Sequence, residues 1–271
     1  MNEGGKMSII PIFNPQEKGR AMKVAAFMSG SGTNIIRLLE EEKRLFEEKG
    51  QSPFEVIFIF SDRSDGKCQG ERIAYENGLP YFSYDIRSFH HKKGIKRTVL
   101  TDEGISARKI YDDVAVRLLK AFEIDVVALG GYMSYTTIDR CVNVHPADLS
   151  ITGTDGKRIY IGDHAVADAI SSGEKTLSSS TLWTDQGVDT GPLLMVSNPL
   201  NVELPKPLDE LLKERDTFMR IVDEHQERLK KIGDWKIFPQ TITMIAEGRF
   251  ALDENHQVYV DGNLVLNGFR Q

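Results

Sequence analysis

The sequence predicts an α/β fold in which a mostly parallel central sheet carries helices on both faces. The first observation is a set of short, continuous apolar runs, which are typical of parallel strands buried on both sides. These runs are Lys23–Met28, Glu55–Phe60 and Asp125–Leu129. The second observation is helical periodicity between them, over 34–48 and 106–122. Strands that alternate with helices along one chain indicate a parallel sheet.

Length and composition set the expected organisation. The chain has 271 residues, enough for one large α/β domain with a small appendage. We expect an N-terminal arm over 1–21 and a single domain over 22–271. Small antiparallel strands are expected at its C-terminal end, around the turn Asp261-Gly262. No apolar run approaches the length of a membrane span.

Charge and cysteine content narrow the function classes. The formal net charge of −6 argues against a general nucleic-acid or membrane binder. Cys68 and Cys141 are the only cysteines, so the chain has no disulfide framework, and the two thiols cannot alone form a zinc site. The sequence is therefore expected to belong to a cytoplasmic protein that acts on small molecules.

The first apolar run leads into a turn of small residues and then into a helix. A helix N-terminus after such a turn offers free backbone N–H groups to an anion. The third glycine of the dinucleotide fingerprint would fall at position 35, where Ile35 stands, so a phosphate monoester is favoured over NAD. The alternative is a tight turn without a ligand. The expected phosphate-binding residues are Gly30, Ser31, Gly32, Thr33 and Asn34.

A strand that ends in Asn143-Val144-His145-Pro146 carries the strongest chemical signal. Side chains alternate across a strand, so Asn143 and His145 leave the backbone on the same side. An amide donor beside an imidazole suits acyl transfer, which needs one group to stabilise an oxyanion and one to move a proton. The alternative is that the motif merely closes a strand.

Two further segments fit this chemistry. Asp189 lies in the glycine-bearing loop 185–192, and the sheet could bring it to Asn143 and His145. A carboxylate near an imidazole holds the ring oriented. Gly130-Gly131 follows a buried strand, where glycines let a flat ligand approach the backbone, although a plain turn is an equal alternative.

The connecting segments carry weaker expectations. The His- and Lys-rich stretch Ser88–Asp102 is expected to be a solvated loop, and Asp62 to cap a turn. A short helix is expected over Thr136–Asp139, and a hairpin around Asp155-Gly156. Asp163 is expected to cap the helix that follows it. In the helix over 106–122, the residues expected to face the core are Ile110, Val114, Leu118 and Phe122.

Taken together, four motifs resemble the folate-dependent formyltransferases, most closely those that act on glycinamide ribonucleotide in purine biosynthesis. The motifs are Val24–Asn34, Val126–Met133, Asn143–Pro146 and Asp185–Pro192, in the family's order and spacing. The resemblance runs from Lys23 nearly to the C-terminus. It implies a Rossmann-like formyltransferase fold, 10-formyltetrahydrofolate as formyl donor and no metal.

The resemblance also implies roles for single residues. It carries over Asn143, His145 and Asp189 as the catalytic residues. Lys231 and Asp234 match positions that the family directs towards the nucleotide substrate, and His164 matches a family histidine. The residues implied to contact the folate are Leu129, Gly130, Gly131, Tyr132, Met133 and Val188.

Three departures from the family pattern leave the acceptor open. A short Pro-Gly stretch is replaced by the longer segment Ile151–Ile161, Ser134 stands where an arginine is usual, and Trp235 stands where a histidine is usual. The alternatives are a formyltransferase for another amine, such as an amino sugar nucleotide, or an inactive nucleotide-binding module of the same fold. The retained catalytic set argues against the latter. The sequence leaves open whether the protein is a monomer or a homodimer.

Overall fold

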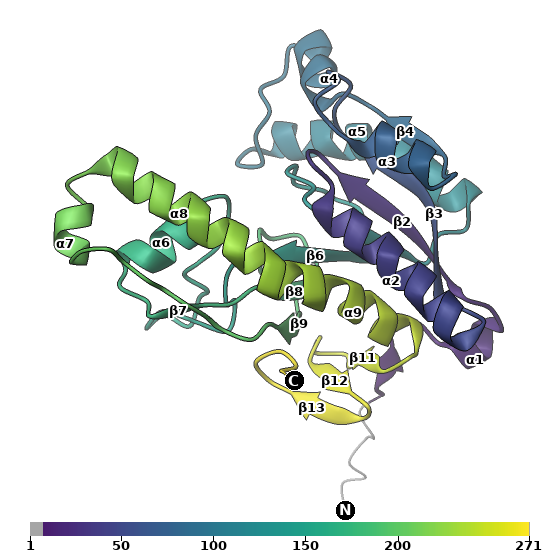
Figure 1. Cartoon of the computed structure of the whole chain (residues 1–271). Helices are drawn as coiled ribbons and strands as arrows, with labels where there is room; N and C mark the ends of the chain where they lie inside the picture. The colour runs from purple at the N-terminus through teal and green to yellow at the C-terminus, as the bar shows by residue number, and fades with distance from the viewer. Residues whose placement is uncertain (1–7, 271) are drawn as a thin grey trace, which may run out of the picture. The chain divides into compact units, whose positions relative to one another are not determined.

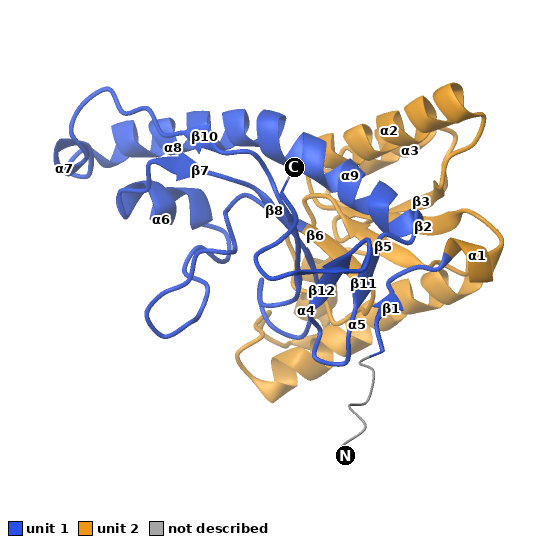
Figure 2. Cartoon of the chain, turned by 90° about the horizontal axis from the view of Figure 1, so that it is seen from below, with its two compact units in different colours: residues 1–14, 144–271 blue, residues 15–143 orange. Residues whose placement is uncertain are grey.

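The structure, a computed structural model, describes residues 8–270 and divides into two compact units (Figures 1 and 2). Unit 2 is residues 15–143, and unit 1 is residues 1–14 with 144–271. Residues 1–7 of the predicted arm and the last residue lie outside the described part of the chain. The division into an arm and a single domain stays a prediction from the sequence.

Parallel strands organise unit 2, as predicted. Neighbouring strands pair in the order β4-β3-β2-β5-β6, and all four pairings are parallel. Their interiors are almost entirely buried, which explains why the sequence shows continuous apolar runs and not alternation. The bounds are β2 Met22–Met28, β3 Phe54–Ser61, β4 Tyr81–Ser83, β5 Val126–Leu129 and β6 Cys141–His145.

Helices cover both faces of these strands, with α2 and α3 opposite α4 and α5 in Figure 2. Phe27 and Phe58 on one face share a core cluster with Leu119 of α5. On the other face Met28 lies next to Gly32, at the start of α2, and next to Ile73 of α3. The bounds are α1 Pro15–Lys18, α2 Thr33–Lys49, α3 Gly70–Glu76, α4 Ile86–Lys93 and α5 Asp102–Ala121.

The loop predicted over 88–102 is wrong in its first part, which forms most of α4. The carboxylate of Asp85 accepts a hydrogen bond from the Ser88 amide at 2.7 Å and caps the helix. Gly94 ends the helix in the left-handed conformation. Ile86 and Phe89 are buried, so two apolar residues within a charged stretch suffice to anchor it.

The predicted inward face of α5 is wrong in its first half, whereas Leu118 and Phe122 pack against the core cluster as predicted. Ile110 is 57% exposed and Val114 is 40% exposed, so neither faces the core. The buried face instead includes Arg108, Tyr111 and Asp112. Arg108 Nη2 lies 2.8 Å from Asp112 Oδ1, and this paired burial of two charges is what an apolar-periodicity argument cannot see.

The short helix predicted over Thr136–Asp139 is absent, because this segment is tied to α5 instead. The backbone amide and the hydroxyl of Thr137 both donate to Asp112 Oδ2, at 2.7 and 2.9 Å. The Thr136 hydroxyl donates to the same oxygen at 3.3 Å. These bonds to a carboxylate replace the backbone bonds of a helical turn.

Unit 1 contains antiparallel strands. In the four-stranded sheet β1-β11-β12-β13, Asp261 and Gly262 join the last two strands with φ of 51° and 79°, as the predicted hairpin turn requires. Strands β8 and β9 pair antiparallel, and β4-β3-β2-β5-β6-β8-β9 is the order of the seven-stranded sheet. The bounds are β1 Ile10–Pro11, β7 Thr176–Leu177, β8 Ser180–Trp183, β9 Leu193–Val196, β10 Leu200–Asn201, β11 Phe250–Leu252, β12 Val258–Val260 and β13 Asn263–Val265.

The helices of unit 1 include one long run in which a π-helical turn, η1, joins α8 to α9 (Figure 1). The N-cap of α6 is His164 and not the predicted Asp163, and its side chain makes no capping bond. Across residues 8–270, no helix is both long and apolar enough to span a membrane. The bounds are α6 Ala165–Ser171, α7 Leu208–Leu211, α8 Arg215–Leu229, η1 Lys230–Asp234 and α9 Trp235–Ala246.

Candidate active site

Strand β6 carries the amide and the imidazole of the predicted catalytic motif. Asn143 and His145 are two residues apart within the strand, so their side chains leave it on the same side. His145 is only 5% exposed. The ring is therefore held by protein contacts and not by bulk water.

Both ring nitrogens of His145 face hydrogen-bond acceptors. Nδ1 lies 3.5 Å from Oδ2 of Asp189, the carboxylate that the sequence places beside it. Nε2 lies 2.9 Å from the carbonyl oxygen of Tyr160. Because a carbonyl only accepts, Nε2 carries the donated proton. Sequence reasoning did not find the second contact, since a backbone acceptor leaves no trace in a side-chain motif.

Asp189 is itself fixed by contacts on both its side chain and its backbone. The Gly162 amide donates to Asp189 Oδ2 at 2.9 Å, and Arg158 Nη1 donates to the Asp189 carbonyl at 2.5 Å. The Asp189 backbone is left-handed, with φ of 53°. Burial lowers the pKa of Arg158, against the raising effect of Asp185 and Asp189.

The predicted phosphate loop joins β2 to α2 inside unit 2. Gly32 is the N-cap of α2 with φ of 70°, and no side chain caps the helix. The first N–H groups of α2 and the positive end of its dipole are therefore available to an anion. Asn34 is 8% exposed, and its amide oxygen has no hydrogen-bond partner within residues 8–270.

The predicted folate residues after β5 divide into an inward and an outward group. Leu129 and the Tyr132 ring are buried, and the Tyr132 hydroxyl accepts a bond from Arg108 Nη2 at 3.0 Å. Burial raises the pKa of Tyr132. In contrast, Met133 is 61% exposed, and a side chain at Gly131 would meet open space. The outward group is the one that a ligand can reach.

A buried carboxylate joins the phosphate loop to this second loop. Asp62 is 3% exposed and accepts hydrogen bonds from the hydroxyls of Ser29, at 2.7 Å, and Ser134. Ser29 Oγ in turn accepts from the Met133 amide at 2.9 Å. Asp62 thus does more than the turn cap expected from the sequence, because it bridges residues from the ends of two strands.

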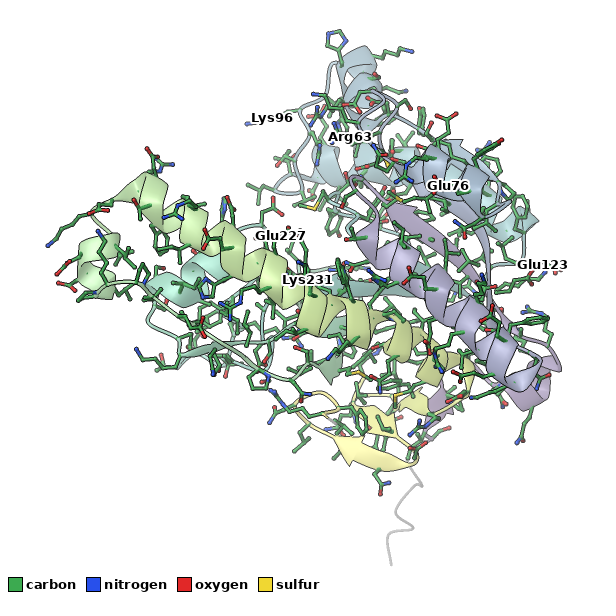
Figure 3. All side chains as sticks on the ribbon, in the orientation of Figure 1. Arg63, Glu76, Lys96, Glu123, Glu227 and Lys231 are labelled. Carbon is green, nitrogen blue, oxygen red and sulfur yellow. The ribbon has the colours of Figure 1, made fainter. Side chains whose placement is uncertain are left out.

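The remaining predicted residues lie in unit 1. Val188 is 44% exposed, and His164 is also exposed. Lys231 lies exposed on η1, where Figure 3 labels it, whereas Asp234 at the end of the same turn is 4% exposed. A π-helical turn of this kind often occurs at functional sites. Within residues 8–270, no cluster of three or more His, Cys, Asp or Glu side chains could hold a metal ion.

Polar side chains lie at the ends of these strands, which is where ligands bind in open α/β sheets. The family model described as formyl transferase matches residues 22–204, which is more than half of the chain. The chain therefore belongs to the formyl transferase family.

Several curated relatives carry related names. The chain is 24% identical over 236 residues to the trifunctional purine biosynthetic protein adenosine-3 of Drosophila melanogaster, covering 84% of this chain but only 14% of the fly protein. It is 26% identical over 182 residues to a chloroplastic phosphoribosylglycinamide formyltransferase of Vigna unguiculata, covering 65% of this chain and 50% of the relative. The Bacillus subtilis phosphoribosylglycinamide formyltransferase is 24% identical over 179 residues, covering 64% of this chain and 76% of the relative.

Solved structures share the fold. Glycinamide ribonucleotide transformylase 1 of Symbiobacterium toebii matches with a TM-score of 0.60 at 22% identity, covering 89% of this chain and 95% of its own. The phosphoribosylglycinamide formyltransferase of Coxiella burnetii matches with a TM-score of 0.64 at 17% identity, covering 93% and 99%. At these identities the similarity establishes the fold, which is the Rossmann-like α/β fold that the sequence predicts.

Proposed function

We propose that this chain transfers a formyl group from 10-formyltetrahydrofolate to the amine of a phosphorylated acceptor, most specifically glycinamide ribonucleotide. The observation that carries the proposal is the His145–Asp189 contact, on the strand that also presents Asn143, within a domain of the formyl transferase family. The names of the relatives point to the same acceptor. Two free cysteines, Cys68 and Cys141, suit a reducing cytoplasm.

The proposed chemistry is direct transfer. The acceptor amine adds to the formyl carbon, the bond from that carbon to the folate nitrogen breaks, and the proton lost by the amine ends on that nitrogen. Asn143 donates a hydrogen bond to the oxyanion that forms during the addition. His145, oriented by Asp189, moves the proton directly or through one water. Oxyanion donors of this kind are worth about 3–4 kcal/mol of barrier.

Binding of the two substrates is assigned to separate sets of residues. The acceptor phosphate is assigned to the backbone N–H groups of 31–34, at the N-terminus of α2 that no side chain caps. Lys231 and Asp234 are proposed to contact the nucleotide, and His164 to border it. The folate is assigned to the outward surface of the loop after β5 and to exposed Val188.

A second acceptor class has one specific observation in its favour. The segment 151–161, which replaces a shorter family stretch, contacts His145 through Tyr160 and Asp189 through Arg158. A different wall beside the reacting groups suits a different amine, such as that of an amino sugar nucleotide. This alternative keeps the formyl donor and the catalytic residues.

The deciding experiment is turnover of 10-formyltetrahydrofolate against a panel of amines that includes glycinamide ribonucleotide and amino sugar nucleotides. We expect Asn143→Ala to lower kcat by about 100- to 1000-fold with an unchanged melting temperature, because it removes a transition-state donor. Asn198→Ala, which changes an exposed asparagine, is the matched control. Failure of the wild-type protein to transfer formyl to any amine would overturn the proposed function.

A further inference from the structure

The 151–162 hairpin consists of a short hairpin over 152–158 and the bends that follow it to Gly162, and it touches the reacting groups. Thr152 and Arg158 form an antiparallel bridge, and the Gly153 amide donates to the Lys157 carbonyl at 2.8 Å. Gly156 takes the left-handed turn position with φ of 77°, as the predicted Asp-Gly turn requires. The hairpin therefore has a defined register, which fixes which of its residues face the site.

Three successive contacts connect this hairpin to the His145–Asp189 pair. Arg158 donates to the Asp189 carbonyl at 2.5 Å, and the Gly162 amide donates to the Asp189 carboxylate at 2.9 Å. Between them, the Tyr160 carbonyl lies 2.9 Å from His145 Nε2. Residues at alternate positions thus reach the same pair, although the chain bends at Tyr160 and again at Gly162.

We propose that the 151–162 hairpin is the positioning element for the reactive pair and that Arg158 is its main positioning residue. The inference rests on the proposed function, since it gives the hairpin a role in formyl transfer. It goes beyond that function because the hairpin replaces a shorter stretch of the family pattern. The chain has thus acquired a cation that holds the backbone of the proposed catalytic carboxylate.

The backbone of Asp189 is the reason that a positioning residue is needed. A non-glycine residue in the left-handed region persists only where its surroundings fix it. The Arg158 guanidinium makes a charge-assisted bond to the Asp189 carbonyl, and such bonds are stronger than neutral ones. Arg158 is also partly buried, so that bond compensates for water that the guanidinium has lost.

Tyr160 supplies the second fixed point. Its side chain is 4% exposed within the cluster that contains Val166 and Ile170, and its hydroxyl donates to Glu174 at 2.7 Å. An anchored side chain holds the Tyr160 carbonyl in place, and this carbonyl orients the imidazole through Nε2. The hairpin therefore fixes the ring and the carboxylate together.

The test compares neighbouring cations in the full chain. Arg158→Met and Lys157→Met each remove one positive charge, but Lys157 is exposed, and Arg158 is the one that donates to Asp189. We expect Arg158→Met to lower kcat about 10- to 100-fold with KM for the folate within twofold, because the reacting groups lose their alignment. Arg158→Lys should recover part of the loss, and Lys157→Met should behave as wild type.

A second readout needs no activity. In protein labelled with ¹⁵N-histidine, Arg158→Met should shift the His145 ring resonances, while Lys157→Met should leave them unchanged. Equal kcat and equal ring resonances for the two variants would overturn the positioning role. If Arg158→Met does not fold, the same comparison with Arg158→Gln decides it. If wild type transfers no formyl group but the resonances shift as expected, the proposed function fails while the positioning of the pair stands.

Discussion

Asp62 is a single side chain on which two loops of unit 2 depend. Its oxygens accept from the Ser29 and Ser134 hydroxyls, and all three residues are buried. Ser134 stands where the family pattern has an arginine, so this chain joins the two loops through a short buried contact. The carboxylate is the common acceptor for donors that would otherwise be unpaired.

We expect Asp62→Ala to lower the free energy of unfolding by about 2–4 kcal/mol, because two buried hydroxyls lose their acceptor. Asp62→Asn keeps one acceptor oxygen and should cost about half as much. Urea denaturation measures both, and Asp65→Ala is the control, since the Asp65–Arg63 ion pair is exposed and screened by water. A loss for Asp62→Ala no larger than that of the control would contradict the bridging role.

The residues that the sequence revealed are those whose side chains form a motif. Asn143 and His145 were predicted from their spacing within one strand, and Asp189 was predicted from its position in a glycine-bearing loop. The carbonyl of Tyr160 and the contact from Arg158 could not be predicted. The first is a backbone group that any residue would supply, and the second depends on how an unmatched hairpin folds back.

Among the elements, helix α2 depends on a glycine at each end, and the two glycines differ in their surroundings. Gly32 and Gly50 cap the helix with φ of 70° and 72°. A Cβ at Gly32 would lie 2.5 Å from Met28 Cε and 2.6 Å from Ile73 Cδ1, whereas nothing lies within 4 Å at Gly50. Substituting alanine at either glycine therefore destabilises the left-handed backbone. Only the substitution at Gly32 also forces the neighbouring side chains to move.

This difference predicts that Gly50→Ala lowers the free energy of unfolding by about 1 kcal/mol and Gly32→Ala by about 2–3 kcal/mol. Urea denaturation of the two variants gives the packing cost as the difference. Gly32→Ala should also weaken binding of the phosphorylated acceptor, because Gly32 shapes the loop before the free N–H groups of α2. Equal losses for the two variants would show that the Met28 and Ile73 side chains simply move aside.

Helix α5 shows why the inward face of a helix could not be predicted as easily as a strand. Strands β2, β3 and β5 were predictable because each contains a continuous apolar run that is buried on both sides, so no choice of face was needed. In α5 the apolar period selected Ile110 and Val114, while the fold buries Arg108 with Asp112. The buried face does carry apolar residues at four-residue spacing, namely Ala107, Tyr111, Ala115 and Leu119, but two of them are small alanines and the face also includes two charged residues. The larger apolar residues of the other row therefore gave the stronger hydrophobic signal.

At the scale of the whole molecule, a half-buried carboxyl on α2 should make stability depend on pH. Burial raises the pKa of Glu42 to about 7, against the lowering effect of the bond that its Oε2 accepts from the Val56 amide at 3.1 Å. The unfolded chain has an ordinary glutamate pKa of about 4.3. Between these two values the folded protein binds more protons than the unfolded one, so stability falls as pH rises through this window.

Glu42→Gln should remove this pH dependence, because an amide oxygen still accepts the Val56 N–H but carries no charge. We expect the variant to match wild type near pH 4.5 and to exceed its free energy of unfolding by about 1–2 kcal/mol at pH 8. This range is well below the free energy that the full pKa shift of Glu42 would give, because the side chain is partly exposed and water screens its charge. Glu47→Gln, which changes an exposed carboxylate on the same helix, should leave the pH profile as in wild type. Urea denaturation at pH 4.5, 6 and 8 measures all three proteins. A Glu42→Gln profile parallel to that of wild type would show that the folded protein holds Glu42 ionised throughout.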